Sequence, residues 1–381
     1  MPEDNFDLIR PYTEEEMREA IPRIINSPAY KPMMDFLFSD DEQENITEAL
    51  SRSKTIGEFQ RNFTLPCISA VINKTTSGTS CSGLEQFDKK KSNLFIANHR
   101  DIALDSSILG MFLINNGITP PAMTWGSNLE LNQFIIDLGK SNQMVTVFRD
   151  GSPKEILRNS QRLSTYINKM ISGNQRSIWI AQSKGRTKDG KDHVDASILK
   201  MLILSGDKNI KQALKNLNLT PVTISYELEP CGAMKVREVY LSGIEGHYVK
   251  DEDEDMQSIL GGFMMPKGRI HVNIGSTISD HLIDSIDDKL TNNEIISEAA
   301  KIIDKETHKN YKLWPTNYLA YDYLENTSRF SDFYNQKNKD EFEQRCQGIY
   351  DIIDDDKEAL RTLFYKMYAN PVYSKIKNNF L

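Results

Sequence analysis

The chain has 381 residues, a formal net charge of −8, and contents of 39% hydrophobic and 26% charged residues. This composition is typical of an ordinary soluble protein and excludes a disordered or an integral membrane chain. No uninterrupted apolar run approaches the ~20 residues that span a bilayer. The negative balance excludes a strong global attraction to nucleic acid, so we expect no nucleic-acid partner.

The cysteines and histidines bear on compartment and metal binding. The four cysteines (Cys67, Cys81, Cys231 and Cys346) contain no C-x-x-C pair. Their scatter favours free thiols in a reducing cytoplasm over a zinc site. The histidines other than His99 form no ligand-spaced pair, so we predict no metal.

Residues 1–62 are predicted to form a helical N-terminal region. Thr13, followed by Glu16, is a capping-box-like helix start. Met17, Ile21 and Ile24 then recur at helical spacing. The sequence indicates no function for this region.

Strand-like and helical patterns alternate over residues 63–285. Strands are predicted at 67–72, 94–97, 122–127, 143–149, 177–182, 220–227, about 237–241 and 269–275, with a Gly/Ser/Thr-rich turn at 75–83. Helices are predicted near 102–116, 128–139, 153–171, 195–203 and 208–216. This alternation predicts an α/β domain with a mostly parallel central sheet flanked by helices. Residues 286–381 are predicted to form a helical C-terminal region.

A polar turn separates the predicted strand at 94–97 from the helix that follows it. The turn carries His99, with Asp101 and Asp105 a few residues downstream. A histidine can take a proton near neutral pH, and a nearby carboxylate can orient its ring, so His99 is a candidate general base. The alternative is that Asp101 and Asp105 cap the helix and His99 is an ordinary turn residue.

Further candidates follow the next predicted strands. These polar and glycine residues are Gly126, Asn128, Arg149, Gly185, Arg186 and Lys188. The carboxyl ends of neighbouring parallel strands share one edge of a sheet, so these residues are expected to converge. Arginine and lysine attract phosphate, and glycine lets backbone N–H groups approach it. Taken singly, each cation is better explained as a solvated loop residue.

Four blocks in this order resemble the glycerolipid acyltransferases, the family that includes glycerol-3-phosphate and lysophosphatidate acyltransferases. The blocks are Asn98-His99-Arg100 with Asp105, Val147-Phe148-Arg149, Gly185-Arg186-Thr187-Lys188, and Thr220-Pro221-Val222-Thr223-Ile224-Ser225-Tyr226-Glu227. The resemblance covers roughly residues 65 to 280. The terminal Tyr226-Glu227 is more similar to the glycerol-3-phosphate branch.

The resemblance implies an O-acyltransferase in which His99 is the base and Asp105 its partner. It also implies that Arg149, Gly185, Arg186 and Lys188 hold a phosphorylated glycerol acceptor. The donor would be acyl-CoA or acyl-carrier protein as co-substrate, with no cofactor and no acyl-enzyme. We accordingly expect a cytoplasmic protein that is peripheral to the inner face of the membrane.

Two positions depart from the family's pattern. Five residues separate His99 from Asp105, where the family has four, and Leu104 occupies the expected aspartate position. We favour Asp105 as the partner of His99, and Asp101 stays open. Lys184 replaces the glutamate that precedes the family's glycine, a sign reversal that could change acceptor binding or impair the enzyme.

Two other functions remain compatible with these residues. The acceptor could be a different lipid or an amine, since fold and base do not fix it. Alternatively, the chain could be a non-catalytic lipid-binding or membrane-scaffold protein, which Lys184 and the shifted aspartate keep open.

Overall fold

The computed structural model describes residues 6–246, 248–251 and 253–381. Their central element is a seven-stranded sheet in the order β1-β7-β6-β2-β5-β3-β4. The strands are β1 Thr76–Ser82, β2 Leu94–Ala97, β3 Ala122–Gly126, β4 Met144–Val147, β5 Ile178–Ala181, β6 Leu219–Tyr226 and β7 Gly268–Ile274. All neighbouring strands pair in parallel except β6 and β7. The predicted α/β class with a mostly parallel sheet is confirmed.

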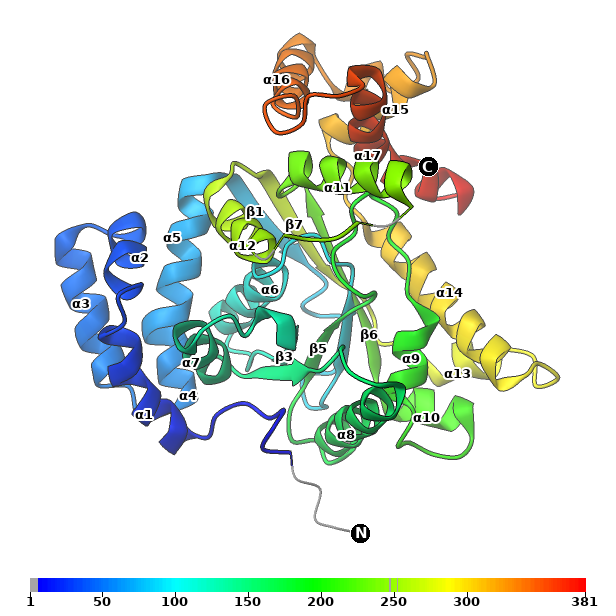
Figure 1. Cartoon of the computed structure of the whole chain (residues 1–381). Helices are drawn as coiled ribbons and strands as arrows, with labels where there is room; N and C mark the ends of the chain where they lie inside the picture. Colours follow the sequence, from blue (N-terminus) through cyan, green and yellow to red (C-terminus); the bar gives the residue numbers. More distant parts are fainter. Residues whose placement is uncertain (1–5, 247, 252) are drawn as a thin grey trace.

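Helices cover the sheet and form both ends of the described chain (Figure 1). Those before and within the sheet are α1 Glu14–Ile25, α2 Tyr30–Leu37, α3 Asp40–Ser51, α4 Ile56–Phe59, α5 Leu65–Thr75, α6 Leu104–Asn115, α7 Gln133–Ser141, α8 Pro153–Ser172, α9 Ala196–Leu202, α10 Ile210–Asn216, α11 Gly232–Glu245 and α12 Glu254–Met264. Those after the sheet are α13 Asp280–Asp284, α14 Asn292–Asn310, α15 Pro315–Leu324, α16 Gln336–Gln347 and α17 Lys357–Lys377.

Three local predictions were wrong. The segment at 67–72 lies in α5, where Ile68, Val71 and Ile72 are buried at helical spacing rather than by alternation. The segment at 237–241 lies in α11. The predicted turn at 75–83 contains edge strand β1, whose ladder with β7 overrides its turn-like Gly/Ser/Thr composition.

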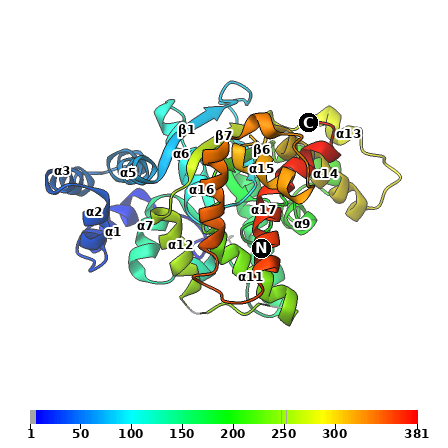
Figure 2. The same cartoon turned by 90° about the horizontal axis from the view of Figure 1, so that it is seen from above.

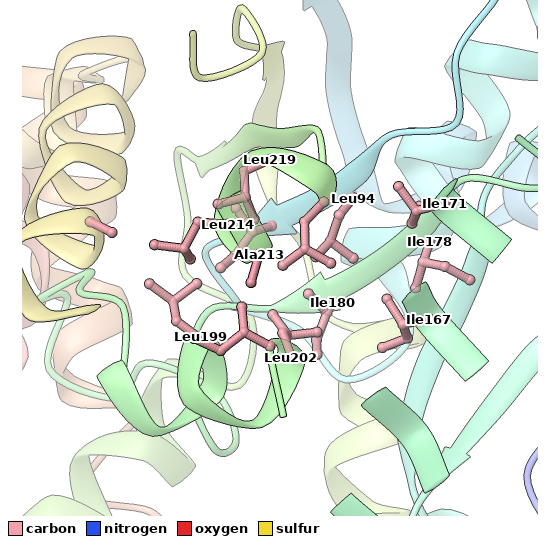
Figure 3. Packing of buried hydrophobic residues seen from close by; sticks show 14 of the residues in the cluster. Leu94, Ile167, Ile171, Ile178, Ile180, Leu199, Leu202, Ala213, Leu214 and Leu219 are labelled. Atoms are coloured by element: carbon pink, nitrogen blue, oxygen red, sulfur yellow. The ribbon is translucent and has the colours of Figure 1, made fainter. Parts of the chain in front are cut away.

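The sheet is buried on both faces, which explains the continuous apolar runs in its central strands. In β2, Leu94 and Ile96 pack into one core, and Phe95 and Ala97 pack into the other. The first core also takes side chains from α8, α9 and α10, as Figure 3 shows. The residues labelled there are Leu94, Ile167, Ile171, Ile178, Ile180, Leu199, Leu202, Ala213, Leu214 and Leu219. Rigid strands therefore hold the loops at their ends.

The N-terminal helices have a small core of their own and join the sheet domain through a continuous helical segment. The predicted capping box is present, because Thr13 Oγ1 accepts from Glu16 N–H and Glu16 accepts from Thr13 N–H. Helix α4 continues through a π-helical turn at Gln60–Thr64 into α5. The predicted boundary between residues 62 and 63 lies within this turn.

The C-terminal helices pack around an aromatic cluster that contains Phe342, Phe364 and Tyr368. Helices α15–α17 lie at the same end of the molecule as α11 (Figure 1), and Thr316 of α15 donates to the carbonyl of Glu227, just after β6, at 2.7 Å. Seen from above, α16 and α17 lie over the end of the sheet where α11 and α12 are found (Figure 2). The C-terminal region thus covers the loops at this end.

Gly83 provides a test of the β1–β7 edge. Its φ is +84°, and an added Cβ would lie 1.8 Å from the carbonyl oxygen of Ile274 at the end of β7. We expect Gly83→Ala to lower the free energy of unfolding, measured by urea denaturation, by about 3 kcal/mol or more, because backbone strain and a clash add. The control is Gly117→Ala, where φ is +68° and the space is open; it should cost only about 1–2 kcal/mol. Equal losses would contradict the clash.

Candidate functional site

The candidate site lies at the carboxyl edge of the parallel strands. Strand β2 ends beside β5, with Ala97 opposite Ala181, and β3 ends beside β4, with Gly126 opposite Val147. Strand β5 also pairs with β3. The loops that leave these four strands therefore emerge at one edge, as the sequence predicted.

Asp105 is the centre of the turn that follows β2. Its Oδ2 accepts hydrogen bonds from the backbone N–H groups of Arg100 and Asp101, at 2.5 and 2.9 Å, and lies 2.9 Å from His99 Nδ1. The Tyr226 hydroxyl donates to its Oδ1 at 2.7 Å. With Nδ1–H directed at the carboxylate, Nε2 of His99 is the nitrogen that can accept a proton.

The exposure of His99 and Asp105 suits a histidine that accepts a proton. The His99 side chain is 13% exposed and that of Asp105 only 1%, so the imidazole is partly accessible while the carboxylate is shielded. The ring of Trp179 on β5 stands edge-on to the imidazole, with centroids 5.8 Å apart. An aromatic wall and a buried carboxylate therefore fix the ring between them.

Asp101 has a different place from Asp105. Its Oδ1 accepts from the N–H groups of Ala103 and Leu104, at 3.0 and 2.9 Å, where α6 begins. The capping alternative thus describes Asp101, whereas Asp105 is the carboxylate bonded to His99. The extra residue is accommodated in the turn before α6. Burial and the neighbouring Asp105 raise the pKa of Asp101.

Arg186 lies beside the His99 turn and beneath α12. The N–H of Thr187 donates to the His99 carbonyl at 2.7 Å, which joins the loop after β5 to that turn. Arg186 Nη2 donates to Ser258 Oγ of α12 at 3.0 Å. Its Nη1 is buried and, among the described residues, has no hydrogen-bond partner. Gly185 before it has a φ of +84° with open space around it, so this backbone conformation favours glycine.

Gly126, Asn128 and Arg149 form a second group at the same edge. A Cβ at Gly126 would lie 2.3 Å from Asn128 Oδ1 and 3.5 Å from Arg149 Nε and Cζ. The missing side chain thus makes room for the Asn128 amide, and the guanidinium of Arg149 lies next to it at van der Waals distance. Asn128 Nδ2 donates to Asp255 Oδ2 of α12 at 2.8 Å, so α12 spans from this group to Arg186.

The two candidate lysines are placed differently from the arginines. Lys188 forms an ion pair with Glu238 of α11, so its charge is already balanced within the protein. Lys184, which precedes Gly185 in the same loop, is exposed. The structure thus places Lys188 against α11, and Arg186 beside the His99 turn.

Sequence reasoning missed a buried charge network behind the turn. Arg100 is fully buried, and its guanidinium contacts Asp192 Oδ2 at 2.6 Å and Glu229 Oε2 at 3.1 Å. Lys235 Nζ donates to Glu229 Oε1 and to the Arg100 carbonyl, both at 2.6 Å. The only local signal was an arginine directly after a buried strand and next to His99.

Two further observations concern metals and membranes. Within the described ranges, no group of three or more His, Cys, Asp or Glu side chains is arranged to hold a metal ion. No helix of the described chain has the length and apolar character needed to cross a bilayer.

Comparisons with known proteins give one structural similarity to report. No protein-family model and no curated protein matches the chain. Among solved structures, the 1-acyl-sn-glycerophosphate (LPA) acyltransferase PlsC from Thermotoga maritima aligns with a TM-score of 0.38 and 12% identity, covering 78% of this chain and 96% of that chain.

Tyr226 provides a test of the Asp105 cluster. Tyr226→Phe removes the only side-chain hydroxyl that donates to Asp105 among the described residues, and leaves Oδ1 buried without that donor. We expect the free energy of unfolding to fall by about 1–3 kcal/mol, measured by urea denaturation. A Tyr166→Phe control removes a hydroxyl that has no hydrogen bond to any described residue, and should cost less. A loss at Tyr226 no larger than at Tyr166 would contradict the assignment.

Lys267, just before β7, provides a test by pH. Burial lowers its pKa from 10.5 to about 8. Between pH 8 and 10.5 the lysine keeps its proton in the unfolded state and has lost it in the folded state. The free energy of unfolding therefore increases with pH in this window. We expect Lys267→Met to lose this gain, up to about 1.4 kcal/mol per pH unit, in urea titrations at pH 7 to 10. If the free energy of unfolding of the wild type and of Lys267→Met changes with pH in the same way, the lowered pKa of Lys267 is contradicted.

Proposed function

We propose that the chain is an acyltransferase that moves a fatty acyl group from a thioester donor to the hydroxyl of glycerol 3-phosphate or 1-acylglycerol 3-phosphate. The observation that carries the proposal is the His99–Asp105 pair, with one ring nitrogen bonded to a buried carboxylate and the ring partly accessible. Beside it lies a guanidinium, that of Arg186, with a buried Nη1 that has no partner among the described residues.

In the proposed reaction, His99 Nε2 removes the proton of the acceptor hydroxyl as its oxygen attacks the thioester carbon. The new C–O bond forms, the C–S bond breaks, and the thiolate leaves with the proton held by the imidazolium. Asp105 keeps the ring oriented and stabilises its charged form. Because the acceptor itself is the nucleophile, no acyl-enzyme forms.

The acceptor phosphate is assigned to the cations at the same edge of the sheet. Arg186 and Arg149 supply forked donors that suit a phosphate group. The space beside Gly185 is open and leaves room for that group next to Arg186. Because Lys188 already forms an ion pair with Glu238, we assign it a structural role in the loop rather than a phosphate contact.

We further propose a donor of the acyl-CoA or acyl-carrier-protein type, no cofactor, and a cytoplasmic location at the inner face of the membrane. Helix α12 supports the contact with lipid. Its face toward the site is small and polar, with Ser258 and Gly262 buried, whereas Leu260 and Met264 are 50% and 58% exposed. A helix that exposes apolar side chains beside a site suits a lipid surface.

The direct experiment follows thiol release from acyl-CoA and acyl-carrier protein with a panel of acceptors. We expect release that depends on glycerol 3-phosphate or 1-acylglycerol 3-phosphate. Release with another lipid or an amine would change the acceptor, and release without acceptor would indicate a thioesterase. No release with any combination would favour the lipid-binding or scaffold alternative.

Substitutions at the turn test the assigned roles. We expect His99→Ala and Asp105→Asn to lower kcat by about 10³-fold, because the base or its orienting partner is lost. Asp101→Asn keeps a side-chain oxygen that can accept from Ala103 and Leu104, and should lower kcat less than about tenfold. Circular dichroism controls for folding. A His99→Ala variant near the wild-type rate would falsify the base assignment.

A further inference from the structure

Hydrogen bonds from several other elements hold the turn that carries His99. The His99 carbonyl accepts from Thr187 N–H at 2.7 Å, and the Arg100 carbonyl accepts from Lys235 Nζ at 2.6 Å. The Asn98 amide bridges to Ile224 of β6, accepting from its N–H at 2.8 Å and donating to its carbonyl at 3.0 Å. The position of the imidazole is therefore set by the groups that hold the residues on either side of it.

A buried charge network around Arg100 also fixes the turn. Two cations, Arg100 and Lys235, face two carboxylates, Asp192 and Glu229, and all four side chains are at most 4% exposed. Removing one member of such a network leaves an uncompensated buried charge, which is expensive. The network therefore keeps one arrangement as long as both carboxylates stay in place.

Glu229 is kept in place by the C-terminal helices. The Tyr368 hydroxyl of α17 accepts a hydrogen bond from the Glu229 N–H at 2.8 Å. Arg345 Nη2 of α16 donates to the Glu229 carbonyl at 3.1 Å. Both backbone polar groups of Glu229 are thus bonded to side chains that lie more than a hundred residues later in the chain.

Asp192 is kept in place from the same region. Its carbonyl accepts from His308 Nε2 of α14 at 2.7 Å, and the carbonyl of Asp189 in the same loop accepts from Asn370 Nδ2 of α17 at 2.6 Å. The ring of Tyr311 lies 5.3 Å from the guanidinium carbon of Arg100. Each partner of Arg100 is therefore fixed by helices α14–α17.

We propose that helices α14–α17 are a positioning element for His99, which acts through Glu229 and Asp192 on Arg100. Tyr368 is then a positioning residue, although it touches neither His99 nor Asp105. The kinetic part of this inference rests on the proposed function, whereas its structural part does not. In this view the C-terminal region is part of the site and not a separate appendage.

A matched pair of substitutions on α17 separates positioning from general stability. Tyr368→Phe removes the hydroxyl that accepts from Glu229 N–H, and Tyr365→Phe removes a hydroxyl that donates to Glu343 within the C-terminal region at 3.2 Å. Both rings pack edge-on against Phe342, with centroid distances of 4.8 and 5.1 Å. The two variants lose the same atom from the same aromatic cluster.

The first readout is hydrogen–deuterium exchange of a peptide that covers residues 98–105. The amides of Arg100 and Asp101, which donate to Asp105, report on the turn. In Tyr368→Phe we expect them to exchange about fivefold faster than in the wild type, the effect of losing one hydrogen bond that holds the network. Tyr365→Phe should leave them unchanged.

The second readout is steady-state acylation. We expect Tyr368→Phe to lower kcat on the order of tenfold with KM within about twofold, because the base is misplaced while the binding groups remain. Tyr365→Phe should keep both constants. If Tyr368→Phe fails to fold, Arg345→Gln, which alters the other hold on Glu229, takes its place with the same expected results.

Unchanged exchange in the 98–105 peptide, or equal acceleration in Tyr368→Phe and Tyr365→Phe, would overturn the inference. If the wild-type protein shows no acylation, the proposed function fails and the exchange measurement still decides whether α14–α17 position the turn. If exchange changes as expected while kcat stays at the wild-type value, positioning of the base is rejected.

Discussion

The carboxylate of Asp105 is the group on which the site depends. A charge with 1% exposure must find donors inside the protein, and Asp105 finds them in the turn of residues 99–101 and in Tyr226 of β6. Satisfying the carboxylate therefore fixes the turn against the sheet. The same turn receives the loop after β5 through His99 and Thr187, so one buried charge organises two of the loops at the edge.

The central strands could be predicted because they are buried on both faces and read as short, continuous apolar runs. The mostly apolar segment at 67–72 was assigned wrongly, because three β-branched residues among six are compatible with a helix or a strand and only packing decides between them. Strand β1 was missed for the opposite reason. Its small polar residues carry no strand signal, and its place comes from the ladder with β7 and from Ser80 and Ser82, which bond to His271.

For the site, the sequence predicted which strand ends would meet but could not decide between Asp101 and Asp105. That choice depends on the path of the turn, in which one carboxylate caps α6 and the other reaches the imidazole. The network around Arg100 was beyond prediction for a different reason. Its partners Asp192, Glu229 and Lys235 lie 92, 129 and 135 residues away, and no spacing rule connects such distant residues.

Gly262 allows helix α12 to pack closely against the turn that carries His99. A Cβ at this position would lie 2.3 Å from Asp101 Oδ2, so the backbone of α12 rests directly on the carboxylate, with no side chain between them. Any larger residue at 262 would act as a spacer and lift the helix off the turn. The distance between α12 and the turn that carries His99 is thereby determined by the absence of a single carbon atom at residue 262.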